Sequence, residues 1–405
     1  MQSDLYAHQQ AFLNKNPKRY LLAHATGTGK TLIAILHSKN KHPTLFIVPK
    51  VLKENWERYC KLYELKVYTI LSKEEFRKVH KTLTRYKSVV VDECHFFGNY
   101  RSQLAKALNW YFKKHDTEYR LFLSATPRLA SPWSIFTLAV LLGHPLEWYQ
   151  FKNKFFYDVR MGLRTIPMPR PNMDGELAKI IHTIGETVRL EDCVDLPPQN
   201  FLQEYIDITE EQRKALFTIS DILPLVRFTK AHQIINGYQS SLIGEPKPLK
   251  DNKIERIIAL CEENNKTAIF ARYNFQLELY KRAIESSKEL KNHKVFLITG
   301  ETKNRDALIQ EAEQAEKCIV LINCMCGIGW EIPSISVIVF ASLSYSFIDY
   351  KQSLGRFLRI NRIKTNTYIN LIGIDSQNKK QSADEAVWEA IEAKRDFDIL
   401  LYERT

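Results

Sequence analysis

One stretch constrains the fold of this 405-residue chain more than any other: residues 24–31, with the sequence HATGTGKT. It joins a short apolar run, Tyr20–Ala23, to another, Leu32–Leu36, in the way that a glycine-rich turn joins a strand to a helix. In such a turn, successive backbone N–H groups and the helix N-terminus point into one hollow that binds phosphate oxygens. The pattern predicts that Lys30 contacts the β- and γ-phosphates of a nucleotide and that the Thr31 hydroxyl ligates Mg²⁺.

The first position of this loop departs from the usual pattern, because His24 stands where glycine is expected. An ordinary glycine-rich turn before a helix is therefore the alternative interpretation. The segments downstream favour the phosphate-binding interpretation.

Two carboxylates follow a second buried strand. The apolar run Ser88–Val91 ends at Asp92 and Glu93, which places both side chains at the carboxyl edge of a sheet, where α/β proteins bind ligands. We predict that Asp92 holds Mg²⁺ through water and that Glu93 polarises the attacking water. A helix cap after a strand is the alternative, but the phosphate loop upstream argues against it.

Apolar strands alternate with helices from residue 24 to 126, which predicts a doubly wound, mostly parallel α/β domain over residues 1–150. A second pattern of the same class, without a phosphate loop, occupies residues 251–405. Between them, residues 151–250 are expected to form a basic, proline-containing linker and a helical junction. Two such domains facing each other would leave a cleft.

Three polar side chains are candidates for binding a nucleotide base or for reporting the state of its phosphates. Gln9 has an amide that offers both a donor and an acceptor, which suits the edge of adenine, although a surface helix start is the preferred interpretation in isolation. Ser124 and Thr126 follow the strand Tyr119–Leu123 and are placed to hydrogen-bond the carboxylate segment and His95. Such bonds could report the phosphate state, although strand–turn chemistry also explains these residues.

Basic side chains are candidates for phosphate contacts. Arg356 and Arg359 are spaced i, i+3, so we expect them to share one helix face and to stabilise charge on a transferring phosphoryl group. A pair of surface arginines is the alternative. Lys50 and Lys53, in a helix that starts after Pro49, could contact a nucleic acid backbone, and a solvated helix face is an equally good interpretation. The basic, proline-broken segment 160–171 is expected to be a loop or an extended clamp, with a solvated linker preferred.

The composition indicates which class of partner and which cellular compartment to expect. The net charge of +12 favours a polyanionic partner. No apolar run approaches the ~20 residues needed to cross a bilayer, so no membrane partner is expected. The polar, acidic start of the chain is unlike a signal peptide, and seven scattered cysteines argue against a disulfide framework. We therefore expect a cytoplasmic protein, or one that works in the cytoplasm of a host.

Taken in order, these segments resemble the motifs of a superfamily 2 helicase over nearly the whole chain. The resemblance implies two RecA-like domains in tandem with an ATP cleft between them. The segments that carry it are Gln9, Ala25–Thr31, Phe46–Trp56, Asp92–His95 (DECH), Ser124–Thr126, Thr267–Phe270, Cys326–Ile332 and Gln352–Arg359.

The resemblance also implies roles for individual residues. The expected cofactors are ATP and Mg²⁺, with Thr31 and Asp92 at the metal. The expected nucleotide-binding residues are Gln9, Ala25, Thr26, Gly27, Thr28, Gly29, Lys30, Thr31 and Gly329. The expected catalytic residues are Lys30, Asp92, Glu93, Gln352, Arg356 and Arg359, and the expected coupling residues are His95, Ser124 and Thr126. Lys50, Lys53 and Asn99 are the candidate nucleic acid contacts.

Within the superfamily the chain is most similar to the Swi/Snf-type ATPases, through Phe46–Pro49 with Asn55–Trp56 and through the junction Asp192–Glu211. It departs from that group at Trp330–Glu331, Ser124–Thr126 and Asn361–Arg362, and its compactness resembles small phage and viral helicases. The resemblance implies a monomeric translocase on DNA, with duplex DNA preferred. A helicase acting on branched DNA or RNA is one alternative, and a nucleic acid-binding module with a vestigial ATP site is another. The intact set of ATP-site residues argues against the last.

Overall fold

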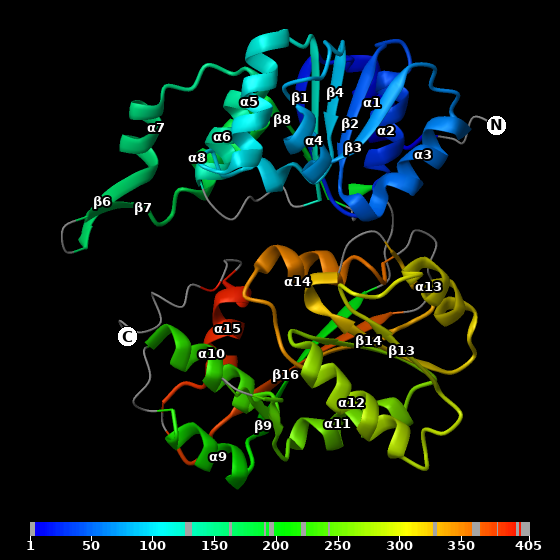
Figure 1. Ribbon diagram of the computed structural model, residues 1–405, viewed down its shortest axis with the longest axis vertical. Helices are drawn as coiled ribbons and strands as arrows, with labels where there is room; N and C mark the ends of the chain where they lie inside the picture. The colour runs from blue at the N-terminus through cyan, green and yellow to red at the C-terminus, as the bar shows by residue number, and fades with distance from the viewer. Residues whose placement is uncertain are drawn as a thin grey trace. The chain divides into compact units, whose positions relative to one another are not determined.

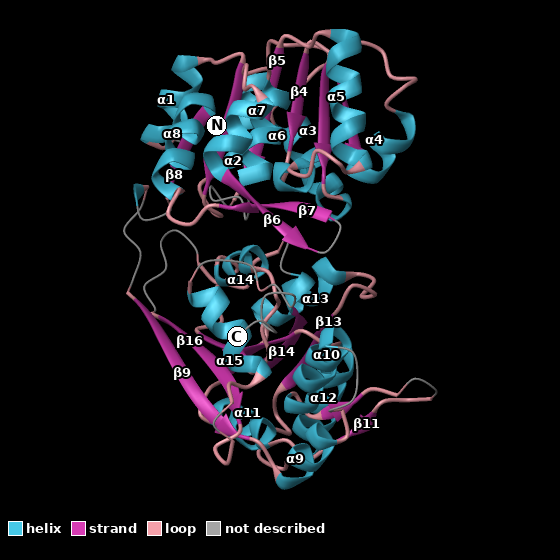
Figure 2. Cartoon of the chain, turned by 90° about the vertical axis from the view of Figure 1, so that its left-hand side faces the viewer, coloured by secondary structure: helices cyan, strands magenta, loops and turns pink. Residues whose placement is uncertain are grey.

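The computed structural model describes residues 5–125, 132–161, 164–189, 192–193, 198–219, 224–241, 244–326, 330–358, 365–378, 380–393 and 397. The chain divides into two compact units, Met1–Asp195 and Leu196–Thr405, which are described separately here. Figure 1 traces the chain from its N-terminus to its C-terminus, and Figure 2 distinguishes helices from strands.

The first unit is built on a six-stranded sheet in which every pairing is parallel, in the order β3-β2-β4-β5-β1-β8. Its strands are β1 (Arg19–His24), β2 (Thr44–Val48), β3 (Tyr68–Ser72), β4 (Ser88–Val91), β5 (Tyr119–Ser124) and β8 (Gly185–Val188). Its helices are α1 (Ala7–Lys15), α2 (Lys30–Ser38), α3 (Lys53–Leu62), α4 (Lys73–Val79), α5 (Gln103–His115), α6 (Pro132–Leu142), α7 (Trp148–Phe155) and α8 (Asp174–Ile184).

Alternate residues of these strands supply two hydrophobic cores, one on each face of the sheet. Leu45 and Ile47 of β2 pack in one core, whereas Phe46 and Val48 pack in the other. A strand covered on both faces is apolar over most of its length, which is why β2 and β4 are apolar after their first residue, Thr44 and Ser88. The predicted parallel α/β architecture is therefore confirmed for this unit.

The basic segment at residues 160–171 differs from the expectation of a loop or clamp. Most of it belongs to an antiparallel hairpin formed by β6 (Phe156–Met161) and β7 (Arg164–Pro169), which is visible beside α7 in Figure 1. A two-stranded hairpin leaves one side of each strand without a ladder partner, so proline is tolerated there. The aromatic rings of Trp133 and Phe156, with centroids 4.4 Å apart, pack the hairpin against α6.

The second unit repeats the design with a parallel six-stranded sheet in the order β13-β14-β12-β15-β16-β9. Its strands are β9 (Gln199–Asp207), β12 (Lys266–Ala271), β13 (Lys294–Ile298), β14 (Cys318–Asn323), β15 (Val337–Phe340) and β16 (Asn366–Ile374), and a small separate ladder joins β10 (Tyr238–Gln239) to β11 (Lys247–Pro248). Its helices are α9 (Glu210–Phe217), α10 (Pro224–Ile235), α11 (Asn252–Glu262), α12 (Asn274–Ser286), α13 (Arg305–Gln314), α14 (Phe347–Leu354) and α15 (Ala383–Glu392).

Residues 151–250, expected to be a linker and junction, contribute strands to both sheets. β8 pairs with β1 in the first unit, and β9 pairs with β16 in the second. The division of the chain at Asp195 and Leu196 falls between these two strands.

A buried ion pair lies inside the second unit. Lys253 Nζ is 2.5 Å from Asp384 Oδ2, and the two side chains are 1% and 5% exposed. Lys253 also donates to Asn236 Oδ1 at 2.8 Å and to the carbonyl of Ala341 at 2.7 Å. The ammonium therefore has three acceptors, matching its three hydrogens. None of the helices that the structure describes is both long enough and apolar enough to span a bilayer.

Candidate functional site

The glycine-rich turn between β1 and α2 has the backbone that the sequence predicts. Gly27 and Gly29 have φ of 85° and 80°, in the left-handed region that favours glycine. A Cβ atom on Gly29 would also collide with Nε2 of Gln9. The two glycines thus let the chain turn tightly into α2, whose N-terminus they present to a ligand.

Gln9 packs against this turn from α1. Its Nε2 donates to the carbonyl of Thr28 at 3.1 Å, and its Oε1 accepts from the backbone N–H of Tyr6 at 3.0 Å. The imidazole of His8 contacts the same Thr28 carbonyl through Nε2 at 3.0 Å. Gln9 is 2% exposed, so adenine recognition by its amide, which remains a prediction, would require these bonds to exchange.

Lys30 lies at the first position of α2, and its ammonium turns back over the loop. Nζ donates to the carbonyls of His24 at 2.7 Å and Ala25 at 3.0 Å. The hydroxyl of Thr28 donates to the same Ala25 carbonyl at 2.8 Å. A phosphate group would compete with two neutral carbonyls for this ammonium, and its greater charge favours the phosphate.

His24, the residue that departs from the usual loop pattern, has a partner that the sequence did not predict. Its Nε2 lies 3.0 Å from Oε1 of Glu186 on β8, and its side chain is fully buried. Burial is the main reason that the pKa of His24 is lowered, so the neutral ring donates its Nε2–H to the carboxylate. Burial opposes ionisation of Glu186, but His24 and Lys15 outweigh it, and the pKa of Glu186 is lowered.

The loop has one further contact with β8, and α1, which packs against the loop, contacts the residues after β8. The backbone N–H of Ala25 donates to the carbonyl of Val188 at 2.8 Å. Nδ1 of His8 lies 3.3 Å from the Cys193 thiol. A link between residues more than 160 positions apart has no local sequence signal, which is why sequence reasoning missed Glu186.

Replacing Glu186 with leucine should weaken ATP binding by about tenfold or more, because a hydrogen bond to a charged group contributes ~1.5–3 kcal/mol and its loss leaves the His24 ring unsatisfied. Titration with a fluorescent ATP analogue measures this affinity. Glu186→Gln is the matched control, since an amide oxygen still accepts from Nε2–H. Equal affinities for both variants would show that the contact does not position the loop.

Asp92 and Glu93 follow β4 at the carboxyl edge of the same sheet. Asp92 is 8% exposed, and its Oδ1 accepts from the backbone N–H of Glu93 at 2.9 Å. Burial and the adjacent Glu93 carboxylate raise the pKa of Asp92 to about 7, whereas Lys30 opposes the rise. A cation beside a buried carboxyl group with a raised pKa would stabilise its ionised form.

The side chain of Trp56, on α3, also orients Asp92. Its Nε1 donates to Asp92 Oδ2 at 3.2 Å, and the indole is fully buried against Phe46. The sequence signal for Trp56 was its place in the motif after Pro49, but nothing in that motif indicated a bond to the carboxylate.

Glu93 adopts a left-handed backbone with φ of 47°, which is uncommon for a residue other than glycine. Its Oε2 lies 3.2 Å from Nδ1 of His95 in the 3₁₀ turn Cys94–Phe97. The imidazole packs on Phe96, and Nζ of Lys73 lies 3.1 Å from the centroid of that phenyl ring. The structure thus brings together Glu93 and His95, a contact that the sequence did not predict; the coupling role of His95 remains a prediction.

The donor set fits Mg²⁺ held together with a nucleotide. Within the described residues, no group of three or more His, Cys, Asp and Glu side chains forms a metal cage. Mg²⁺ bound with a nucleotide needs only one or two protein ligands, because phosphates and water supply the rest. Asp92, a carboxylate that is 8% exposed at the carboxyl edge of the sheet, is the side chain that favours a cation at this position.

The remaining predicted residues of the first unit are spread over several elements. Ser124 ends β5 in register with Ala23, and Thr126 lies outside the described residues. Lys50 is exposed, whereas Lys53 forms a 2.7 Å ion pair with Glu75. Asn99 is exposed and accepts a hydrogen bond from the backbone N–H of Arg101. Of the three candidate nucleic acid contacts, Lys50 and Asn99 therefore present side chains that form no ion pair with a described residue.

The predicted arginines of the second unit are placed differently from the expectation. α14 ends at Leu354, so Arg356 lies in the turn after the helix and not on a helix face; Arg359 lies outside the described residues, as does Gly329. Gly355, the C-cap residue of α14, has a right-handed backbone and separates the helix from the arginine. Arg356 is 6% exposed and donates to the carbonyl of Trp330 at 3.3 Å, and Gln352 is buried on α14.

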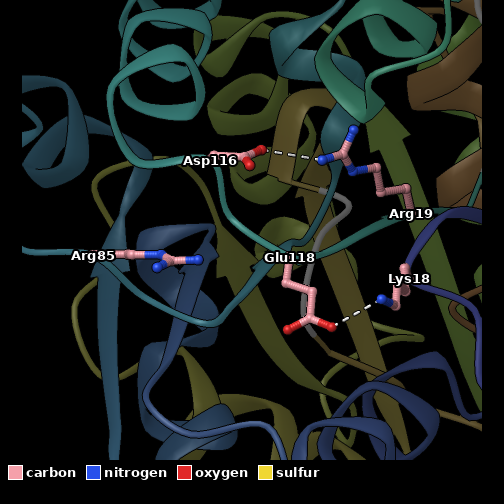
Figure 3. Close-up of a pocket in the computed structure, with 5 residues that line it drawn as sticks. All are labelled: Lys18, Arg19, Arg85, Asp116 and Glu118. Carbon is pink, nitrogen blue, oxygen red and sulfur yellow. Dashed lines mark hydrogen bonds and ion pairs between the residues drawn. The ribbon is translucent and has the colours of Figure 1, made fainter.

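A surface pocket lies away from all of these residues. Lys18, Arg19, Arg85, Asp116 and Glu118 line it, as Figure 3 shows. These residues precede β1, β4 and β5, so the pocket is at the amino edge of the sheet, opposite the phosphate loop. It takes no part in the candidate ATP site.

Comparison with known proteins finds two family matches. Residues 1–78 match the family described as type III restriction enzyme, res subunit, and residues 250–361 match the helicase conserved C-terminal domain. Among solved structures, the chain is similar to the Hef helicase domain of Pyrococcus furiosus, with 13% identity, a TM-score of 0.52, and 96% of this chain and 98% of that chain covered. It is also similar to the SWI2/SNF2 ATPase core of Sulfolobus solfataricus in complex with dsDNA, with 21% identity, a TM-score of 0.43, and 92% and 89% covered.

The two family matches fall on the two units, and each unit carries a parallel six-stranded sheet. Tandem RecA-like domains have this organisation. The two sheets therefore match the tandem RecA-like fold of the superfamily 2 helicases.

Proposed function

We propose that this protein is an ATP-dependent DNA translocase that couples ATP hydrolysis to movement along DNA, with duplex DNA as its preferred track. The observation that carries the ATPase part is the shared sheet edge in the first unit. There, the turn at Gly27 and Gly29 and the ammonium of Lys30 follow β1, and the carboxylates of Asp92 and Glu93 follow β4, a parallel strand of the same sheet separated from β1 by β5 alone.

In this proposal each residue performs one chemical task. The loop N–H groups and Lys30 bind phosphate oxygens, and Thr31 and Asp92 hold Mg²⁺. Mg²⁺, when bound, neutralises charge on the phosphates during transfer. Glu93 accepts a proton from the attacking water, and His95 holds the Glu93 carboxylate in place.

Arg356 is the proposed source of positive charge from the second unit, with Arg359 beside it in sequence. Nη1 of Arg356 donates to the carbonyl of Trp330, and a phosphate, which is charged, would be a stronger acceptor than this neutral carbonyl. Gln352 and Gly329 are proposed to support this site, and Ser124 and Thr126 to couple it to Glu93.

The proposal of DNA rests on charge and on the resemblance of Phe46–Trp56 to the Swi/Snf motif. The net charge of +12 favours a phosphate backbone, and Lys50 and Asn99 offer exposed polar side chains near the candidate site. Contacts to phosphates make DNA binding strongly dependent on salt and give it little preference for sequence.

Hydrolysis of ATP should be measured without nucleic acid and with duplex DNA, single-stranded DNA, branched DNA or RNA. We expect duplex DNA to give the largest stimulation, of about tenfold or more over the basal rate, falling steeply with salt. Preference for branched or single-stranded DNA would indicate a fork-acting or conventional helicase, and preference for RNA would overturn the proposal of DNA. Binding of nucleic acid with no hydrolysis on any of them would favour a binding module.

A further inference from the structure

The loops that precede the strands of the first unit carry a high density of cations. β1, β2, β4 and β5 run parallel, so the residues before each strand lie at one edge of the sheet, opposite the phosphate loop. Residues 16–19, 39–43, 80–87 and 113–118 together contain nine lysines and arginines and two acids. We call the cations with side-chain exposure the basic edge: Lys18, Arg19, Lys39, Lys81, Arg85, Lys87, Lys113 and Lys114.

Direct contacts hold these loops together as one surface. The backbone N–H of Lys87 donates to the carbonyl of Pro43 at 2.9 Å, and the Lys87 carbonyl accepts from the N–H of Tyr119 at 3.0 Å. Nζ of Lys114 donates to the carbonyl of Lys81 at 3.4 Å. The basic edge is therefore fixed by the sheet and does not depend on a single loop.

The two acids leave most of this charge uncompensated. Lys18 pairs with Glu118 at 3.1 Å, and Arg19 pairs with Asp116 at 3.3 Å. In Figure 3, Arg85 extends into the same pocket without an interaction to either carboxylate. Lys81, Arg85 and Lys87 form no ion pair with any described residue, so the loop before β4 contributes three open positive charges.

The cations also crowd one another. Burial and the nearby charge of Lys87 lower the pKa of Lys41 to about 8. Its ammonium lies 2.6 Å from Oδ1 of Asn16 and 4.7 Å from the ring centroid of Tyr119. Like charges this close disfavour the folded state, and an external anion would relieve the repulsion.

The side chains around the basic edge favour a phosphate backbone over a protein partner. None of the exposed large hydrophobic residues in the described chain falls within residues 16–19, 39–43, 80–87 or 113–118. Protein interfaces are centred on clusters of aromatic and apolar anchors, whereas the loop before β3 adds a single exposed valine, Val67, to this edge. A polyphosphate needs only an array of cations that release its counterions.

We propose that the basic edge is a second nucleic acid-binding surface. It would hold the phosphate backbone of a DNA segment other than the one along which the ATPase moves. It lies at the edge of the sheet opposite Lys30 and Asp92 and requires no ATP hydrolysis. The inference goes beyond the proposed function, because one molecule would hold two segments of DNA at once.

The test is a bridging assay with two 30-base-pair duplexes, one immobilised and one fluorescent. The variant K81Q/R85Q/K87Q removes three open charges from one loop outside helices and strands. We expect its capture of the fluorescent duplex to fall by about tenfold, while binding to the immobilised duplex persists. The slope of log Kd against log salt should fall by two to three, since each phosphate contact contributes ~0.9.

The matched control is R282Q/K288Q/K291Q, which removes the same charge from exposed positions of the second unit and should bridge like the wild type. Equal bridging by both triple variants would overturn the proposal of a second binding surface. So would a wild type that binds one duplex but does not bridge two. A wild type that binds no DNA would instead contradict the proposed function. The edge variant is expected to fold, because removing Lys87 lessens repulsion at Lys41.

Discussion

Replacing Lys30 with alanine is expected to reduce nucleic acid-stimulated ATP hydrolysis by at least about 100-fold, the usual cost of deleting a cation or donor that stabilises transition-state charge. The ammonium of Lys30 is the cation closest to the loop carbonyls of His24 and Ala25, where phosphates are proposed to bind. A coupled assay of phosphate release at saturating DNA measures the loss.

The matched control for this prediction is Lys78→Ala, which removes an exposed lysine from α4 of the same unit and should leave turnover near the wild-type rate. Circular dichroism should show that both variants are folded. Wild-type turnover by Lys30→Ala would remove the phosphate-loop assignment and, with it, the mechanism proposed for Asp92 and Glu93.

Replacing Lys253 with methionine should destabilise the second unit by about 3–5 kcal/mol, because it leaves the carboxylate of Asp384 buried without its cation. Asp384 also accepts from Asn236 Nδ2 at 2.8 Å and from the N–H of Gly373 at 3.0 Å. These neutral donors cannot balance the charge alone. Hydrogen exchange in β12 and β16, followed by mass spectrometry, reports stability of this unit specifically.

The pH dependence of the Lys253→Met variant gives a second signature. In the wild type, burial opposes ionisation of Asp384, but Lys253 and His232 outweigh it, so its pKa is lowered from 3.8. Its contribution to stability is therefore present above pH 3.8 and is lost as pH falls through the lower folded value. Without Lys253, burial should raise this pKa, and the variant's defect should shrink as the pH is lowered.

The double variant Lys253→Met/Asp384→Leu should recover much of the loss, because both buried charges are then gone. Lys288→Met, at an exposed position, should change stability little. If the single and double variants were equally unstable at every pH, the pair would contribute packing rather than charge compensation.

The sequence predicted those parts of the fold whose cause is local. The apolar run Leu45–Val48, with Thr44 before it, corresponds to β2 residue for residue, because a strand buried on both faces is apolar over most of its length. The glycines at 27 and 29 predicted the phosphate turn because that backbone requires them. By contrast, β8 contains a glycine and a charged residue in four positions, and its strand conformation depends on pairing with β1.

The details of the candidate site depended on packing that no local pattern records. Trp56 reaches Asp92 across 36 positions, and Glu186 reaches His24 across 162. The i, i+3 spacing of Arg356 and Arg359 suggested a helix, but helical spacing indicates a shared face only while the helix continues. Here, the helix ends at Leu354, two residues before Arg356.

The pairing of β8 with β1 determines where the chain can be divided into fragments that fold on their own. A fragment ending at residue 150 would leave Leu21–His24 as an open strand edge, with unpaired N–H and C=O groups that invite association with other chains. It would also separate His24 from Glu186 and His8 from Cys193. An autonomous first half must therefore run through Cys193, and a protease that severs the native chain into two stable halves should act between β8 and β9.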